Sequence, residues 1–132
     1  MKIEVSNGEI MDKYSILEIK LLNITDEAKR ANVMKEYLEL TPNIEQIYTQ
    51  NQANHDELSA LYEDLLNVNK TLWNIEDQIR ECERDENFGS DFIELARSVY
   101  YTNDDRADVK KQINTLTGSM LVEEKSYEDY KN

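Results

Sequence analysis

The sequence predicts an all-α protein, an antiparallel helical bundle that contains one long coiled-coil helix. Its 132 residues include only three glycines and one proline, which favours long helices over β-sandwiches or barrels that need frequent turns. Apolar residues recur in steps of three and four along most of the chain, the spacing of one helix face. Between residues 44 and 82 this alternation is unbroken for more than five heptads, which is typical of a coiled coil.

The composition also limits the compartment and the partners. With 28 acidic against 15 basic residues the formal net charge is −13, so the average surface repels nucleic acid and anionic membranes. Cys82 is the only cysteine, which excludes an internal disulfide and favours a reducing compartment. Neither a signal-peptide core nor an apolar stretch of membrane-spanning length occurs. We expect one domain over residues 1–132, located in the cytoplasm, with no nucleic-acid or membrane partner.

The first helix is expected near residues 8–24. Ser6 offers an N-cap oxygen, and Glu9 follows three residues later as in a capping box. One apolar stripe follows, made of Ile10, Tyr14, Leu17, Leu21 and Ile24. Before this helix, residues 2–5 alternate in character and include β-branched side chains. They could form a minor two-stranded pairing with residues 121–127.

The second and third helices are expected near residues 26–40 and 42–86. Thr25 followed by two acids is typical of an N-cap with negative charge in the first turn. Pro42 is accepted at the start of a helix but interrupts a preceding one, so a boundary is expected between Thr41 and Pro42. The seam of the third helix consists of Ile44, Ile47, Asn51, Asn54, Leu58, Leu61, Leu65, Val68, Leu72, Ile75, Ile79 and Cys82. At about 1.5 Å per residue this helix would be on the order of 60 Å long.

Two positions of that seam, Asn51 and Asn54, are polar. A polar residue on a coiled-coil seam typically fixes register and oligomeric state, although the two asparagines could instead mark a polar pocket. Because the first two helices are shorter than the third, part of the seam would stay uncovered. The sequence therefore predicts a homodimer. The expected interaction seam is Ile44, Ile47, Asn51, Asn54, Leu58 and Leu61.

The fourth helix is expected near residues 90–117. Gly89 suits the left-handed residue past the end of a helix, and Ser90 suits the next N-cap. An apolar stripe follows in strict steps of three and four, interrupted by one cation; it is Phe92, Leu95, Val99, Thr102, Arg106, Val109, Ile113 and Leu116. Gly118 is expected to end the helix.

Arg106, on that stripe, needs a partner because an unpaired charge out of water is costly. One interpretation is a structural ion pair with Glu9, Asp12 or Glu18. The other is an anion-binding pocket, since a guanidinium suits phosphate or carboxylate. The candidate ligand-binding residues are Lys13, Tyr14, Lys20, Arg97, Asn103, Arg106 and Lys110. Clustering of these cations in one cavity would favour the pocket, and scattered, paired cations would count against it.

Signals for catalysis, metals and cofactors are weak. His55 is the only histidine, and no nucleophile signature surrounds it. The three glycines are isolated from one another, so a phosphate-binding loop is excluded. Acidic pairs lack the histidines of di-iron bundles. We expect no metal and no cofactor, and the sequence leaves enzymatic activity open.

Three blocks of the chain, "IEVSNGEIMDKYSILEIK", "ELARSVYYTNDDRADVKKQIN" and "LVEEKSY", resemble a family of small uncharacterised helical proteins of bacteria and phages, a domain of unknown function. The resemblance covers nearly the whole chain. It implies no catalytic residue, because the family has no assigned activity. It also implies a phosphorylated sugar or nucleotide sugar as the first ligand class to test.

Two functional hypotheses follow from the sequence. The first is a helical interaction or assembly protein, homodimeric through the heptad seam and able to bind a protein partner. The alternative is a binder of, or small enzyme acting on, an anionic metabolite held in a cationic pocket between helices. The unbroken heptad supports the first hypothesis, and Arg106 with its neighbouring cations supports the second.

Overall fold

The chain folds into four helices, which confirms the predicted all-α class. They are α1 (Asn7–Asn23), α2 (Glu27–Gln50), α3 (His55–Arg84) and α4 (Ser90–Thr117), with a 3₁₀ turn, η1 (Gln52–Asn54), between α2 and α3. This computed structural model describes residues 1–119, 121, 124, 126 and 128–130, and no strand occurs among them. Residues 2–5 are therefore not a strand, and the strand expected for residues 121–127 lies partly outside the described residues.

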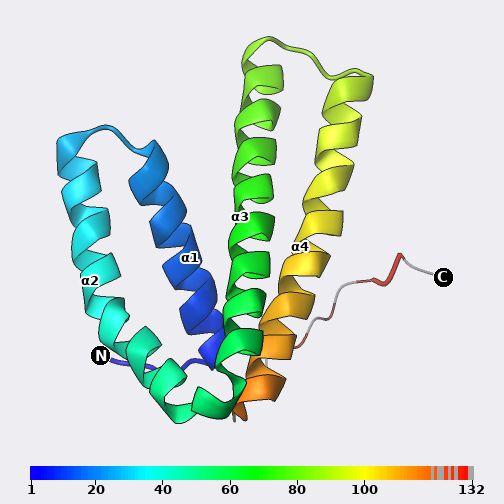
Figure 1. Ribbon diagram of the computed structural model, residues 1–132. Coiled ribbons are helices and arrows are strands. Elements are labelled where there is room, and N and C mark those ends of the chain that lie inside the picture. Colours follow the sequence, from blue (N-terminus) through cyan, green and yellow to red (C-terminus); the bar gives the residue numbers. More distant parts are fainter. Residues whose placement is uncertain (120, 122–123, 125, 127, 131–132) are drawn as a thin grey trace.

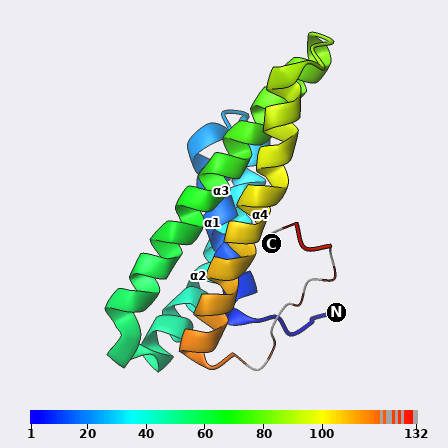
Figure 2. The same cartoon turned by 90° about the vertical axis from the view of Figure 1, so that its right-hand side faces the viewer.

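The helices form a bundle of two hairpins, α1–α2 and α3–α4 (Figure 1). The hairpins converge at the end that holds η1 and diverge toward their other ends (Figure 1). Seen from the side, α3 and α4 form one layer in front of α1 and α2, and the tip of their hairpin stands clear of the second layer (Figure 2). Because α1 contacts both α3 and α4, it is the helix that joins the two hairpins.

The apolar core lies toward the closed end and draws on all four helices. Its buried members are Met11, Ile47, Leu58, Leu61, Leu65 and Ile113. Ile44 packs against this cluster and is half-buried. Ile47, Leu58 and Leu61 of the expected interaction seam are thus buried inside a single chain. These side chains are not available for a second copy in this fold.

The start of α1 follows the predicted capping pattern and places α1 close to α4. The Ser6 hydroxyl accepts a hydrogen bond from the Glu9 amide at 3.1 Å. The Gly8 amide donates to Oδ1 of Asn114 at 2.7 Å. A Cβ atom at Gly8 would lie 2.6 Å from the carbonyl oxygen of Lys110. Only glycine therefore allows this approach of the two helices.

The prediction of one helix over residues 42–86 is wrong. The chain instead reverses at residues 51–54, where α2 ends, η1 forms and α3 begins (Figure 1). Asn51 is the C-cap of α2, and its side-chain amide donates to the Ile47 carbonyl at 2.8 Å. Asn54 is the N-cap of α3, so neither asparagine lies on a continuous seam. The steps of three and four persist across the reversal because the residues on both sides of it face the same core.

The expected boundary at Thr41 and Pro42 is also wrong, since α2 runs through both residues. Pro42 removes the N–H that would bond to the Leu38 carbonyl, which normally costs about 3 kcal/mol inside a helix. The neighbouring hydroxyl of Thr41 donates to the Tyr37 carbonyl at 2.9 Å and lies 3.1 Å from the Tyr14 hydroxyl. These contacts hold this turn of α2 against α1, so packing outweighs the cost of the proline.

The remaining helix ends agree with the sequence except for their caps. Asp26, not Thr25, caps α2, and its carboxylate accepts from the Lys29 amide at 2.9 Å. The bounds of α4 match the prediction, and Gly118 ends it with a φ of 64°. At the α3–α4 turn, however, Gly89 is the N-cap with a φ of −81°, and the left-handed residue is Glu86.

Candidate functional site

Arg106 forms an ion pair with Asp12, one of the three partners considered from the sequence. Its Nε donates to Asp12 Oδ1 at 2.9 Å, and its Nη2 donates to Asp12 Oδ2. The Asp12 side chain is 2% exposed, whereas that of Arg106 is 29% exposed. Two parallel hydrogen bonds between a guanidinium and a carboxylate give a strong and well-oriented contact. This pair joins the first helix to the last.

Asp12 also organises a cluster that includes α3. The side-chain amide of Asn69 donates to Asp12 Oδ1 at 2.9 Å and to the Ser15 hydroxyl at 2.8 Å. The Ser15 hydroxyl in turn donates to the Asp12 carbonyl at 2.7 Å. We call Asp12, Ser15, Asn69 and Arg106 the buried polar cluster. Because its hydrogen bonds connect α1, α3 and α4, the cluster fixes how the two hairpins meet.

Lys110, one turn beyond Arg106, is buried and also paired. Its ammonium lies 2.8 Å from Glu9 Oε2 and 4.0 Å from Asp12 Oδ2. The charges of Arg106 and Lys110 are therefore balanced by the carboxylates of Glu9 and Asp12. A second layer of polar contacts between α1 and α4 thus lies beside the buried polar cluster.

The other predicted cations are scattered. Lys13 is exposed and pairs with Glu36 of α2 at 2.8 Å. Arg97 is exposed on α4, where hydrogen bonds from its side chain to the hydroxyls of Tyr100 and Tyr101 raise its pKa. Lys20 lies near the end of α1 and is half-buried. By the criterion stated from the sequence, this scattered and paired arrangement counts against an anion pocket.

Tyr14 belongs to a cluster of tyrosines between α1, α2 and α3. Its ring lies 4.4 Å from that of Tyr37, at an interplanar angle of 12°, and 6.3 Å from that of Tyr62. Interaction with the Tyr14 hydroxyl, together with burial, raises the pKa of Tyr37 to about 12. Burial and the nearby Glu18 carboxylate raise the pKa of Tyr62. Both hydroxyls therefore stay neutral. Tyr37 helps to hold α2 against α1, and the Tyr62 hydroxyl joins α3 to α1 by donating to Glu18 at 3.2 Å.

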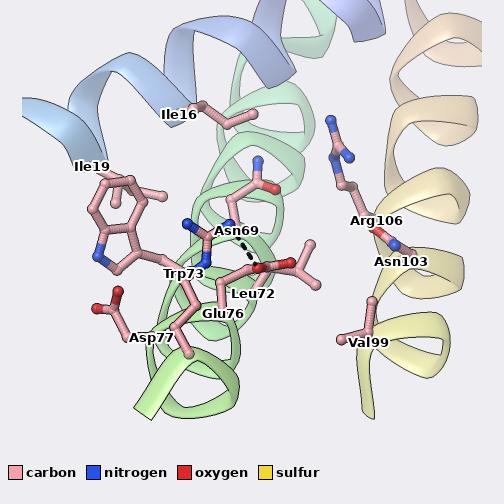
Figure 3. Close-up of a pocket in the computed structure, with 11 residues that line it drawn as sticks. Ile16, Ile19, Asn69, Leu72, Trp73, Glu76, Asp77, Val99, Asn103 and Arg106 are labelled. Atoms are coloured by element: carbon pink, nitrogen blue, oxygen red, sulfur yellow. Dashed lines mark hydrogen bonds and ion pairs between the residues drawn. The ribbon is translucent and has the colours of Figure 1, made fainter. Parts of the chain in front are cut away.

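A groove opens next to the buried polar cluster, between α1, α3 and the middle of α4 (Figure 3). Its volume is about 440 Å³. Its apolar wall consists of Ile16, Ile19, Leu72, Trp73 and Val99. Of the predicted ligand-binding residues, only Asn103 and Arg106 line it. A groove of this size is in the range of small-molecule and side-chain binding sites.

The polar part of the groove comes from α3 and α4. Asn69 and Arg106 approach the groove from the side of the buried polar cluster, while Glu76 and Asp77 lie farther along α3 (Figure 3). Arg80 also lines the groove. Arg80 and Glu76 form an exposed pair at 3.5 Å. Because Arg106 is balanced by Asp12, the remaining charge near the groove is the carboxylate of Asp77.

The sequence reasoning missed Asn69 and Trp73. Both lie one residue after a seam position, Val68 and Leu72, and they are four residues apart on α3. A polar and an aromatic residue at this spacing share one helix flank, which was an available signal. Only the packing of α1 across that flank shows that the flank is part of a groove.

Two further findings concern the described residues as a whole. No three side chains of histidine, cysteine, aspartate or glutamate come together there in a way that could hold a metal ion. None of the described helices combines the length and apolar character needed to cross a membrane.

The comparisons with known proteins identify a family whose model covers nearly the whole chain. The model of the "Family of unknown function (DUF6165)" matches residues 1–131. No curated protein and no solved structure matches the chain.

Proposed function

The chain belongs to this family of unknown function, and we propose that it is a non-enzymatic helical interaction protein that binds a protein partner on the far half of its α3–α4 hairpin. This far half, residues 72–105, is called the distal hairpin below. The single observation that carries the proposal is that the outer end of the distal hairpin, around the α3–α4 turn, projects beyond α1–α2 (Figures 1 and 2).

Apolar side chains remain exposed on this projecting part. Phe88 is 52% exposed and Ile93 is 55% exposed. Tyr100 and Tyr101 add two more exposed rings. Burying one large apolar side chain contributes about 1.5–3 kcal/mol, so a partner on this surface would gain several such contributions.

The polar residues fit this proposal better than they fit an enzyme of anionic metabolites. The most buried charged groups, Asp12 and Lys110, are engaged in contacts between helices. Arg106 pairs with Asp12, while Lys13 and Arg97 lie elsewhere on the surface. Such contacts stabilise the arrangement of α1 against α4 and present no set of converging cations to a substrate.

In place of the homodimer predicted from the heptad seam, we propose a different protein partner whose charge is opposite to that of the acidic distal hairpin. Ile47, Leu58 and Leu61 are buried in the chain's own core. The distal hairpin carries ten acids and three arginines between residues 72 and 105. Two copies that met through it would bring like charges together, which opposes association. The protein acts in this proposal as a single cytoplasmic domain.

A capture experiment with matched variants tests the proposal. Wild-type chain, the double variant Phe88→Glu/Ile93→Glu and the control Leu22→Glu/Leu38→Glu are immobilised and exposed to extract from the source cells. All four positions are exposed, at 69% for Leu22 and 60% for Leu38, so both variants should fold. We expect wild type and control to retain the same protein, and the distal-hairpin variant to lose it.

Two results would contradict the proposal. Equal retention by all three chains would show that the distal hairpin is not the binding surface. A stable dimer of the purified wild type in sedimentation that dissociates in the Phe88→Glu/Ile93→Glu variant would restore the homodimer, with an interface different from the predicted seam.

A further inference from the structure

The groove beside the buried polar cluster contains one hydrogen-bond acceptor that is set up for a ligand. Asn69 is 5% exposed, and its amide group donates to both Asp12 and Ser15. A primary amide has two N–H donors and one oxygen, so these two bonds use its donors. No side chain in the described part of the chain donates to Asn69 Oδ1, and Asn69 lines the groove. A ligand with an N–H or O–H donor would complement this oxygen.

The groove walls favour a ligand that has an apolar part next to its hydrogen-bond donor. Leu72 of α3 faces Val99 of α4, while Trp73 of α3 lies beside Ile19 of α1 on the other side of the groove (Figure 3). Ile16 of α1 completes the apolar wall. A long side chain with an aliphatic stem and a charged head matches this arrangement, because such side chains bury their stems against apolar surface. Lysine and arginine have that shape and end in N–H donors.

The charge around the groove also favours a lysine or arginine side chain. Within the groove, Arg106 is balanced by Asp12 and Arg80 by Glu76, which leaves the carboxylate of Asp77 in excess. The distal hairpin beyond it carries more than twice as many acids as cations. Complementary charge favours a basic partner and disfavours both an acidic partner and a second copy of this chain.

We infer that the groove seats a basic amphipathic helix of the partner protein, with one lysine or arginine inserted so that its head donates to Asn69 Oδ1 and its stem packs on Trp73. This inference rests on the proposed function and names the partner's chemistry. The inserted helix lies along α3 and α4 where α1 diverges from them, and turns the distal pair of helices into a group of three (Figure 1).

The single tryptophan of the chain reports occupancy of the groove directly, because Trp73 lines it. The probe is a synthetic peptide of about 18 residues, leucine and lysine in amphipathic spacing and free of aromatic residues. Its control has glutamate in place of every lysine. We expect the lysine peptide to shift the Trp73 emission to shorter wavelength and the glutamate peptide to leave it unchanged. Raising salt from about 0.05 M to about 0.3 M should weaken binding at least about fivefold.

Two variants with matched controls separate groove binding from general attraction to an acidic protein. Val99→Arg places a charged side chain in the groove and should weaken binding at least about tenfold, whereas Leu38→Arg makes the same charge change on α2 and should stay within about twofold. Asp77 is exposed, so Asp77→Lys should not disturb the fold. It should weaken binding about fivefold, more than Glu39→Lys on α2 does. Thermal melts of each variant establish that it is folded.

Several outcomes would overturn the inference. The groove would be excluded as the binding site of a basic helix if both peptides bound. Equal effects of Asp77→Lys and Glu39→Lys would exclude it too, as would binding without a change in Trp73 emission. A concentration-dependent emission shift of the chain alone would identify a second copy as the occupant. If the groove fails while the Phe88→Glu/Ile93→Glu variant still loses its partner, the proposed function stands and only the partner's chemistry is wrong.

Discussion

Asp12 is the residue on which the contacts between α1, α3 and α4 converge. Its carboxylate accepts hydrogen bonds from Arg106 and Asn69 and lies 4.0 Å from the ammonium of Lys110. A buried carboxylate of this kind is tolerated because each oxygen has a donor. An arginine on the apolar stripe of α4 is thus explained by an aspartate buried on α1.

We predict that Asp12→Ala destabilises the fold by about 3–5 kcal/mol, since it leaves a partly buried guanidinium and a buried ammonium without their shared carboxylate. The control Lys13→Ala removes the exposed pair with Glu36 and should cost less than about 1 kcal/mol. Urea unfolding followed by circular dichroism measures both. In the double variant Asp12→Ala/Arg106→Met, the loss should be smaller than the sum of the single losses. Additive losses would show that the two side chains do not stabilise each other.

Gly8 marks the closest approach of α1 to α4. Glycine to alanine usually stabilises a helix by about 1 kcal/mol. Here the new methyl would meet the Lys110 carbonyl oxygen at 2.6 Å and Asn114 Oδ1 at 2.9 Å. We predict that Gly8→Ala lowers the unfolding free energy by about 1–3 kcal/mol, because the helices must separate.

The matched control for Gly8 is Gly89→Ala. A Cβ at Gly89 meets nothing closer than Asn87 Oδ1 at 3.5 Å. This change should cost no more than about 1 kcal/mol, the usual difference between glycine and alanine at an N-cap. An unchanged or raised melting temperature for Gly8→Ala would mean that α1 and α4 lie farther apart than described here.

At the scale of the helices, periodicity is informative about which residues are buried but not about where a chain reverses. The seam positions before and after Asn51 and Asn54 belong to one core, so the three-four spacing continues through the turn. In this region Pro42 indicated a helix boundary, whereas the seam position of Asn51 indicated a continuous helix. The helix continued through Pro42 and stopped at Asn51, because the contacts of Thr41 and the capping bond of Asn51 decided the outcome.

We predict that Asn51→Leu/Asn54→Leu converts part of the population to a dimer of twice the wild-type mass. Leucine restores helix propensity and removes the capping bond, which favours one continuous helix across the turn. The two hairpins of one chain would then pack against those of a second copy, as in domain swapping. Light scattering after gel filtration measures the mass. The control Asn74→Leu lies at an exposed position within α3 and should leave the mass unchanged. If the double variant also kept the wild-type mass, the turn would not depend on these two asparagines.

At the scale of the whole molecule, the bundle is asymmetric. Four helices enclose the closed end, whereas only α3 and α4 remain at the tip of the distal hairpin (Figure 1). Residues 83–91 at its tip are all exposed. The part proposed to bind a partner therefore includes the most exposed turn between two helices of the bundle.

We predict that backbone amides of the distal hairpin exchange with solvent at least about tenfold faster than those of α3 and α4 near Leu65 and Ile113, because fewer packed side chains oppose local opening. Hydrogen exchange followed by mass spectrometry resolves the two regions. The lysine–leucine peptide should slow exchange in residues 72–105 if it occupies the groove. Uniform protection along α3 and α4 would contradict this asymmetry.

The sequence by itself determined the all-α class, the bounds of α4, the start of α1 at Ser6 and the need of Arg106 for a partner, with Asp12 among three candidates. These features depend on local propensity, capping and hydrophobic spacing, which are encoded within a few residues of each other. Most buried apolar positions follow from the same spacing.

Only the tertiary structure decided the reversal at residues 51–54, the burial of the expected interaction seam and the assembly of the groove from three helices. Each depends on which helix faces of one chain meet, and a heptad pattern has the same form whether its partner is the same chain or another. Asn69 shows the limit most clearly, since one residue on α3 became part of both a buried cluster and a groove only when α1 packed beside it.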